Sequence, residues 1–285
     1  SIGKGPVWFT FTGGETMLRE DIDTMVRYIM KYNKPAYINI ATSGIYPEKT
    51  EKKIIQILDE IKNKSILTVN LSIDEIEKNY DFVRGVPNGF EKVKKTYILL
   101  KKLKTNHKNL IIGVNIVLSK FNNTRFKKIV RYIMRELDPD SLVSEIGSKR
   151  KAIYFEEDIS IPKQEYIDNL NFLLVQNTHK NNAKLTSFFR KNYYRLVKKH
   201  VNIDKEILKC YAGYASCEIS CTGEIWNCAV RADSMGSLKK EEYNFFKVWE
   251  STRAYNVRKT IKDEKCFCNT ANPNYTNMIC NLKIL

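Results

Sequence analysis

Cysteine is the residue whose placement in this chain most clearly indicates chemistry. All seven cysteines follow residue 209, and they are Cys210, Cys217, Cys221, Cys228, Cys266, Cys268 and Cys280. An extracellular disulfide framework normally pairs an even number of cysteines. Clustered cysteines inside a cell more often bind metal or carry out redox chemistry. The sequence therefore predicts a metal or redox site in this region of a cytoplasmic protein.

The order of these cysteines indicates which of them converge. The segment from Cys210 to Cys228 is predicted to form two short strands around a turn at Thr222-Gly223, which would bring its end cysteines together. A helix is expected over residues 246–257, followed by Cys266-Phe267-Cys268. Four thiolates from such segments suit zinc or an iron–sulfur cluster. The Cys-x2-Cys pairs that are usual at zinc sites do not occur in the sequence.

A second group of candidate residues lies near the start of the chain. Gly13, Gly14 and Glu15 follow a short β-rich run and precede a helix-like stretch. Two glycines let the backbone approach a ligand closely, and N–H groups at a helix start favour anions. A glutamate can accept hydrogen bonds from an ammonium group. Taken alone, such a Gly-Gly-Glu is more often a tight turn than a site.

A third group follows a later apolar run. Ser72 and Asp74 end that run, and Arg84 lies on the segment beyond it. A hydroxyl or carboxylate at a strand end can bind ribose, and an arginine can hold a carboxylate through two hydrogen bonds. The alternative for each residue is structural, with Asp74 as a helix N-cap and Arg84 as a surface charge.

The elements that must position these residues alternate along residues 7–146. Strand-like runs occur at residues 7–12, 36–41, 66–71, 110–118 and 141–146, and helical periodicity occurs at residues 18–29, 54–61, 90–100 and 129–137. This βαβα pattern predicts a parallel sheet, and an open or partial (β/α) barrel and a doubly wound sheet fit it equally well. In either fold the ligand lies at the carboxyl ends of the strands.

The remaining composition restricts the class of protein. Two helices are expected between residues 162 and 200, with a domain boundary near residue 200. The net charge is +16, but the lysines are scattered over helix faces without interleaved aromatic residues, which argues against nucleic-acid binding. The histidines His107, His179 and His200 are expected to be solvated. No apolar run approaches the roughly 18–20 residues of a membrane span.

Taken together, the N-terminal motifs resemble the radical S-adenosylmethionine (SAM) superfamily over most of residues 7–120. The resemblance rests on Phe-Thr-Gly-Gly-Glu, then Thr42-Ser43-Gly44, then Ser-Ile-Asp with Arg-Gly twelve residues beyond the serine. It implies that Gly13, Gly14 and Glu15 hold the methionyl amino group, and that Ser72 and Arg84 contact the ribose and carboxylate side with Asp74 near them. It also includes Ser43 and Asn115 among the cofactor-binding residues.

The sequence departs from that family at one essential point. The family binds its catalytic [4Fe–4S] cluster through Cys-x3-Cys-x2-Cys, and this sequence contains no such motif. We expect the motif to lie upstream of Ser1 in a longer protein. The alternative is a degenerate relative that does not cleave SAM.

The C-terminal cysteines are similar to the SPASM or twitch extensions of radical SAM enzymes. The similarity lies in Cys-x-Ala-Gly from Cys210, Ile-x3-Gly-Glu-Ile from Ile219, and the closing Cys228. It implies one auxiliary [4Fe–4S] cluster, for which we predict the ligands Cys210, Cys228, Cys266 and Cys268. Cys217, Cys221 and Cys280 are then expected to be buried small apolar residues.

These expectations define one principal hypothesis. Residues 1–200 form a partial (β/α) barrel and residues 201–285 a small cysteine-rich domain. The protein is a radical SAM enzyme that uses a 5′-deoxyadenosyl radical to modify a peptide or protein side chain, with flavodoxin or ferredoxin as electron donor. The auxiliary cluster binds substrate or accepts an electron. Alternatives are a dehydrogenase of a small molecule such as a sugar, an RNA-modifying enzyme, and a non-catalytic, metal-stabilised binding protein.

Overall fold

A computed structural model describes residues 2–148, 150–152, 157–176 and 184–281. The chain forms two compact units. The N-terminal unit comprises residues 2–144, and the C-terminal unit comprises residues 145–176 and the chain after residue 184. This division falls earlier than the domain boundary predicted near residue 200, so the two helices expected between residues 162 and 200 belong to the same unit as the cysteines.

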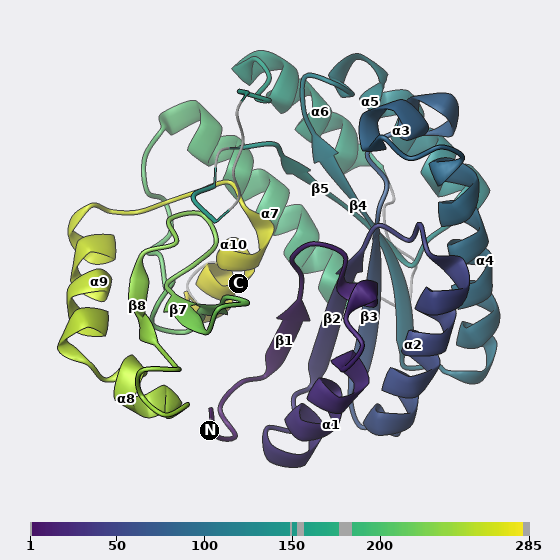
Figure 1. The fold of residues 1–285 in the computed structure, drawn as a ribbon. Helices are drawn as coiled ribbons and strands as arrows, with labels where there is room; N and C mark the ends of the chain where they lie inside the picture. Colours follow the sequence, from purple (N-terminus) through teal and green to yellow (C-terminus); the bar gives the residue numbers. More distant parts are fainter. Residues whose placement is uncertain (1, 149, 153–156, 177–183, 282–285) are drawn as a thin grey trace. The chain divides into compact units, whose positions relative to one another are not determined.

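The N-terminal unit alternates strands and helices along the sequence (Figure 1). Its elements are β1 (Trp8–Phe11), the 3₁₀ turn η1 (Thr16–Leu18), α1 (Ile22–Tyr32), β2 (Tyr37–Thr42), α2 (Pro47–Ile61), β3 (Ile66–Ser72), α3 (Glu77–Arg84), α4 (Gly89–Asn106), β4 (Leu110–Leu118), η2 (Asn123–Arg125), α5 (Phe126–Tyr132), the π-helical turn η3 (Ile133–Leu137) and β5 (Ser141–Ile146). The predicted strands and helices of this region are confirmed, and α3 is an addition to them.

Strand order distinguishes between the two folds that the pattern allowed. The five strands lie in the order β1-β2-β3-β4-β5, and the ladders from β1 to β4 are parallel. Successive helices pack side by side, α1 on α2, α2 on α4 and α3 on α4, so they form one layer on one face of the sheet. A doubly wound sheet would reverse its strand order and carry helices on both faces. The sequential order therefore confirms the partial (β/α) barrel.

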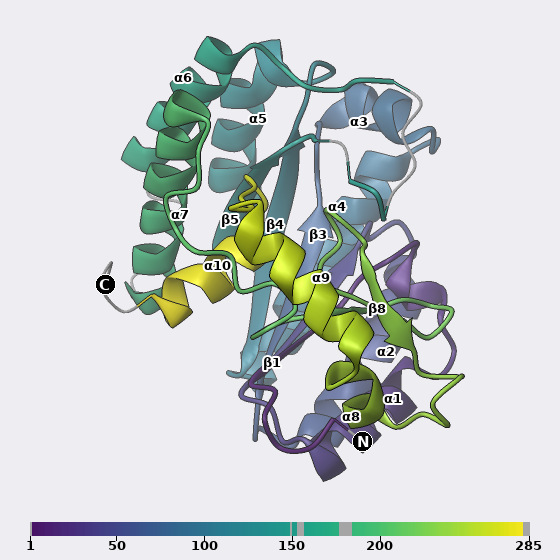
Figure 2. The same cartoon turned by 90° about the vertical axis from the view of Figure 1, so that its left-hand side faces the viewer.

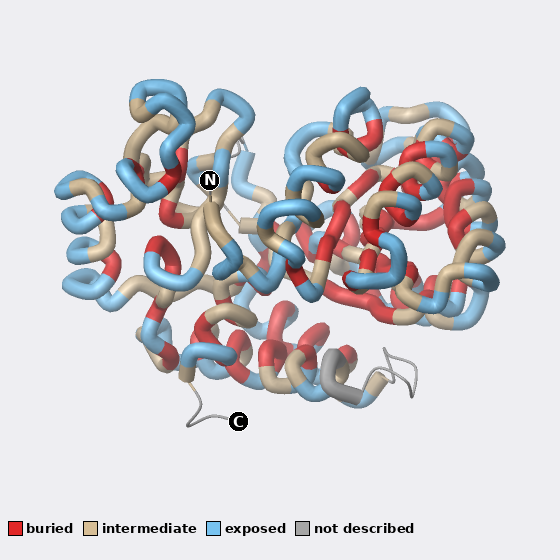
Figure 3. Tube along the Cα trace, turned by 90° about the horizontal axis from the view of Figure 1, so that it is seen from below, coloured by how far each residue is buried: buried red, intermediate tan, exposed pale blue. Residues whose placement is uncertain are grey.

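The two faces of this sheet differ in polarity. Strand residues on the helix-covered face are apolar and fully buried, as Ile38, Ile40, Leu67, Val69, Leu71, Ile112 and Val114 show. In the tube coloured by burial, buried stretches lie inside and exposed stretches lie around them (Figure 3). The register places Thr10, Asn39, Thr68, Asn70, Ser72 and Asn115 together on the opposite face. That inner face is therefore suited to a polar ligand.

A buried amide pair lies on this inner face. The side-chain nitrogen of Asn70 donates to Oδ1 of Asn39 over 2.7 Å, and both residues are buried. Gly113 stands opposite Asn70 in the β3–β4 register. A Cβ at Gly113 would lie 2.0 Å from Oδ1 of Asn70 and 3.0 Å from Oγ of Ser141. The glycine is therefore required here for space, since it leaves room for the amide of its neighbour.

The C-terminal unit contains less regular structure. Its elements are α6 (Lys163–Val175), α7 (Lys184–Ile203), β6 (Glu218–Ile219), β7 (Glu224–Trp226), β8 (Ser234–Ser237), α8 (Phe245–Trp249), α9 (Thr252–Asp263) and α10 (Ala271–Cys280). The helices α6 and α7 run antiparallel (Figure 2), since Lys163 bonds Asn202 and Lys198 bonds Asn171. The strands β6, β7 and β8 form a separate antiparallel sheet.

Three details of this unit differ from expectation. The hairpin is shorter than predicted, because β6 and β7 pair only over Glu218–Ile219 and Glu224–Trp226 and leave Cys210 outside. The helix expected over residues 246–257 is two helices, α8 and α9. The imidazole of His200 is buried rather than solvated, since the residue is 1% exposed and its ring packs on Phe267.

No helix within the described ranges combines the length and apolarity needed to cross a membrane.

The contact between Gly113 and Asn70 predicts the effect of one added methyl group. We expect Gly113→Ala to lower the free energy of unfolding by about 1–3 kcal/mol, because the buried Asn70 amide must move to accept the methyl. Urea denaturation of the full chain measures this change. Gly5→Ala is the matched control, since nothing lies within 4 Å of its Cβ position. Equal stabilities of the two variants would contradict the steric argument.

Candidate functional site

The Gly-Gly-Glu turn connects β1 to the short turn η1. Gly13 has a φ of +138°, a conformation that side chains disfavour, and added Cβ atoms at Gly13 and Gly14 would meet nothing within 4 Å. Glu15 is the N-cap of η1, and its Oε1 accepts a hydrogen bond from the Met17 N–H over 3.0 Å. The turn therefore presents an open backbone beside a fixed carboxylate, as a ligand with an ammonium group requires.

The Glu15 carboxylate also connects two strand ends. Its Oε1 accepts from Oγ1 of Thr42 over 2.6 Å, and its Oε2 accepts from the Ser43 backbone N–H over 2.8 Å and from the Ser43 hydroxyl. The sequence predicted that this carboxylate serves a ligand. In the structure it is also a brace that joins the ends of β1 and β2, and a ligand ammonium would share it with these protein donors.

Arg84, Asp74 and Ser72 form the second part of the site, where β3 ends. One Arg84 nitrogen, Nη2, donates to the Ser72 carbonyl over 3.2 Å and pairs with the Asp74 carboxylate. The other Asp74 oxygen accepts from the Val117 N–H over 2.7 Å, which connects this end of β3 to β4. Nε of Arg84 is buried without a hydrogen-bond partner. The guanidinium is thus fixed on one side and retains an N–H for an acceptor.

Burial is the largest influence on the pKa of the Asp74 carboxyl group. Burial raises the pKa of Asp74, although the Arg84 guanidinium and the Val117 N–H act in the opposite direction.

Tyr80 was not identified from the sequence, yet its ring lies 5.9 Å from the Arg84 guanidinium and its hydroxyl donates to the Ser43 carbonyl over 3.3 Å. Burial raises the pKa of Tyr80 to about 12, so this hydroxyl stays a proton donor near neutrality.

The predicted cofactor residues lie at one edge of the sheet. Ser72 pairs with Asn115 in the β3–β4 register, and the Asn115 carbonyl accepts from the Ile73 N–H over 2.9 Å. Glu15 and Ser43 occupy the corresponding ends of β1 and β2. Carboxyl ends of parallel strands are where ligands bind in such sheets. The roles assigned to individual residues stay predictions.

The four cysteines predicted as cluster ligands also come together, within the C-terminal unit. Cys210 is buried in a small apolar cluster with Ala212 and Ile261, against which Cys228 and Cys266 pack. Cys210 and Cys266 are hydrogen-bonded, which raises the pKa of the Cys210 thiol and lowers that of Cys266. Burial raises the pKa of Cys268 to about 11, and the charges of Cys228 and Cys266 add to the effect.

Burial favours the neutral thiol at Cys210, Cys228 and Cys268, whereas Cys266 is stabilised as a thiolate. The Arg231 backbone N–H donates to Sγ of Cys228 over 3.4 Å, and the Arg231 side chain lowers the pKa of Cys266. Within the described ranges, no three His, Cys, Asp or Glu side chains are arranged to hold a single metal ion. The thiolates of a [4Fe–4S] cluster bind separate irons, so a shared ion position is not a requirement for that cofactor. The residues present fit such a cluster.

The other three cysteines differ from expectation in part. Cys217 is half-buried rather than fully buried, and the burial that it has raises its pKa to about 11. Cys221, in the turn between β6 and β7, and Cys280, at the end of α10, are exposed rather than buried. Two of the three are therefore not core residues, and none of them takes part in the Cys210 cluster.

The fold comprises a partial (β/α) barrel unit with candidate ligand residues at its strand ends, and a second unit that contains a group of cysteine thiols. Residues 4–133 match the model of the Radical SAM superfamily. The match covers a little under half of the chain, and it confirms the resemblance that the sequence motifs predicted. The cofactors that this assignment implies are SAM and a [4Fe–4S] cluster.

Known proteins resemble different shares of the chain. The GTP 3′,8-cyclase of Aliarcobacter butzleri (strain RM4018) is 29% identical over 108 residues, covering 35% of this chain and 31% of the cyclase. That of Helicobacter pylori (strain ATCC 700392 / 26695) is 26% identical over 108 residues, covering 35% of this chain and 32% of the cyclase. The chain thus aligns with about a third of the length of these relatives.

Solved structures share the fold over more of the chain. Native anSMEcpe with bound AdoMet and Kp18Cys peptide superposes with a TM-score of 0.58 at 18% identity, covering 92% of this chain and 73% of that one. Native anSMEcpe with bound AdoMet gives a TM-score of 0.56 at 17% identity, covering 91% of this chain and 70% of that one. At such identities the likeness shows the fold.

The Glu15 brace predicts a loss of stability on a nearly isosteric change. In Glu15→Gln an NH₂ group replaces one acceptor oxygen and faces the donors of Thr42 or Ser43. We expect the free energy of unfolding to fall by about 1–3 kcal/mol. Urea denaturation measures it, with Asp59→Asn on the exposed side of α2 as a control expected within about 0.5 kcal/mol of the parent. If Glu15→Gln behaves like this control, the carboxylate is not a brace.

Proposed function

We propose that the chain is the larger part of a radical SAM enzyme that modifies a peptide or protein side chain, with an auxiliary [4Fe–4S] cluster on Cys210, Cys228, Cys266 and Cys268. The observation that carries the proposal is the convergence of these four thiols, from three separate segments, in a chain that also contains a radical SAM domain. When bound, SAM and its catalytic cluster supply a radical that removes a hydrogen atom from substrate.

The N-terminal unit would hold SAM through the charged and polar groups of the cofactor. Glu15, with the open backbone at Gly13 and Gly14, accepts the methionyl ammonium, and Arg84 donates its unpartnered Nε–H to the carboxylate. Asp74 fixes the guanidinium in place, while Ser72, Ser43 and Asn115 offer hydroxyl and amide groups at the same sheet edge. No cysteine precedes residue 210, so the first 209 residues include no cysteine ligand for the catalytic cluster.

The share of the chain that each known protein matches supports a peptide as the substrate. The fold likeness to anSMEcpe, whose structure contains a bound peptide, extends over 92% of the chain, so it includes the cysteine-bearing unit. The match to GTP cyclases covers 35% of the chain. A nucleoside triphosphate is the second candidate substrate, because these cyclases are the relatives found by sequence. A cytoplasmic location and a flavodoxin or ferredoxin donor stay predictions.

Metal analysis tests the auxiliary cluster. After anaerobic reconstitution we expect about four irons and four sulfides per chain with a broad charge-transfer band. Cys210→Ala and Cys266→Ala should lose this band, whereas Cys221→Ala and Cys280→Ala, which change exposed thiols, should retain it. Zinc in place of iron, no metal, or equal loss in all four variants would refute the cluster and favour a non-catalytic binding protein.

Calorimetric titration with SAM tests the ligand site. Arg84→Lys keeps a cation for Asp74 but lacks the planar fork, so we expect SAM affinity to fall by about tenfold with little change in stability. Arg135→Lys, at an exposed position of η3, should bind SAM like the parent chain. Unchanged affinity in Arg84→Lys would remove this residue from the site.

Titration with GTP and with a cysteine-containing peptide distinguishes the two substrate classes. We expect the peptide to bind and GTP to bind no more tightly than ATP. Guanine-selective binding without peptide binding would replace the peptide proposal with the nucleotide one.

A further inference from the structure

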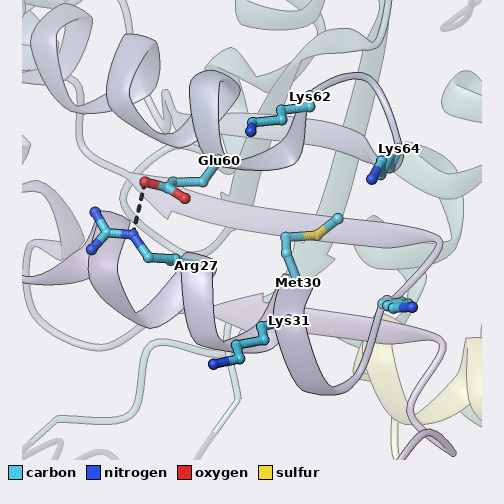
Figure 4. A pocket seen from close by; sticks show the side chains of 7 residues that line it. Arg27, Met30, Lys31, Glu60, Lys62 and Lys64 are labelled. Atoms are coloured by element: carbon cyan, nitrogen blue, oxygen red, sulfur yellow. Dashed lines mark hydrogen bonds and ion pairs between the residues drawn. The ribbon is translucent and has the colours of Figure 1, made fainter.

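A basic pocket lies in the N-terminal unit, outside the site described above (Figure 4). Its volume is about 420 Å³, and it is lined by Arg27, Met30, Lys31, Lys34, Glu60, Lys62 and Lys64. Lys34 precedes β2 and Lys64 precedes β3, so the pocket lies where strands begin. The SAM-site residues follow the ends of those strands, and a strand of six residues separates the two edges by roughly 20 Å. The pocket is therefore separate from the SAM site.

The pocket carries more positive charge than its own acid can balance. Nε of Arg27 donates to Glu60 over 2.9 Å, and Glu60 is the single carboxylate in the lining. The four lining lysines form no ion pair in the described part of the chain; they are Lys31, Lys34, Lys62 and Lys64. Four ammonium groups around one hollow repel one another, and a bound anion would relieve that repulsion.

Helix electrostatics accounts for only part of this arrangement. A cation near a helix carboxyl end is favourable, which explains Lys31 in the last turn of α1 and Lys62 at the C-cap of α2. Lys34 and Lys64 lie beyond the helix ends. Lys34 and Lys62 moreover adopt φ values of +50° and +47°, where glycine is the residue of lowest cost. Lysine thus occupies two positions for which the backbone conformation favours a different residue.

We propose that this pocket binds a small polyanion that carries two or more phosphate groups. Lysine ammonium groups act as point charges for phosphate, and four of them spaced around the hollow match several phosphates better than one. A volume of about 420 Å³ is that of a small-ligand site. The hollow is half open and its four lysines are exposed, so a small soluble anion can reach all of them. The binding is independent of SAM and of the thiol cluster.

Calorimetric titration of the full chain with tripolyphosphate tests the proposal. We expect saturable binding that weakens as sodium chloride rises from about 50 to about 300 mM. The double variant Lys62→Gln/Lys64→Gln should weaken binding by about tenfold or more. Lys259→Gln/Lys262→Gln, which changes two exposed lysines of α9, removes the same charge and should change the affinity by less than about twofold.

Each alternative outcome overturns the proposal in a different way. No binding of tripolyphosphate refutes the site, and equal weakening in both double variants shows a non-specific response to the net charge of +16. Orthophosphate binding as tightly as tripolyphosphate refutes the polyphosphate class. A single-stranded oligonucleotide that binds more tightly than tripolyphosphate, and loses affinity in Lys62→Gln/Lys64→Gln, would replace the small ligand with a nucleic acid.

Discussion

The sequential order of five parallel strands is the constraint on which the N-terminal unit depends. Because β1 to β4 are each followed by helical structure and α1 to α4 pack side by side, these helices form one layer and the carboxyl ends of the strands meet at one edge. Residues far apart in the sequence, such as Glu15, Ser43 and Arg84, are thereby brought to that edge. The Glu15 carboxylate then connects two of the strand ends directly, so its position serves both the fold and the site.

Because α1 to α4 lie on one face of the sheet, they do not cover its inner face. Natural cores usually bury apolar residues on both faces of a parallel sheet. Here the inner face carries Asn39, Asn70 and Ser141, and Gly113 provides the space for their side chains. A buried acceptor without a partner, Oδ1 of Asn70, remains on this face. Polar side chains on a buried face contribute little to the stability of the fold, but they are suited to contact with a polar substrate.

The C-terminal unit is organised by different forces. Its sheet consists of strands of two to four residues, which contribute little stability by themselves. Cys210 is buried at a position that leucine or valine would fill in an ordinary core, and the half-buried Cys228 packs against it. Neutral thiols can be buried there, whereas thiolates require a cation, and Arg231 lies beside Cys228 and Cys266. A metal cluster bound by these thiolates would provide positive charge beside them and would join the chain segments that carry them.

Hydrophobic patterning in the sequence alone predicted the five strands and the main helices of residues 7–146 other than α3, because the strands are short apolar runs and the helices repeat apolar residues with a helical period. The motifs likewise determined which polar residues lie at the strand ends. Only the tertiary structure decided between a partial barrel and a doubly wound sheet, since both have the same local pattern. Contacts distant in sequence were also beyond prediction: Glu15 as a brace, Tyr80 beside Arg84, and His200 buried on Phe267. Each depends on which chain segments pack together, and periodicity carries no information about that choice.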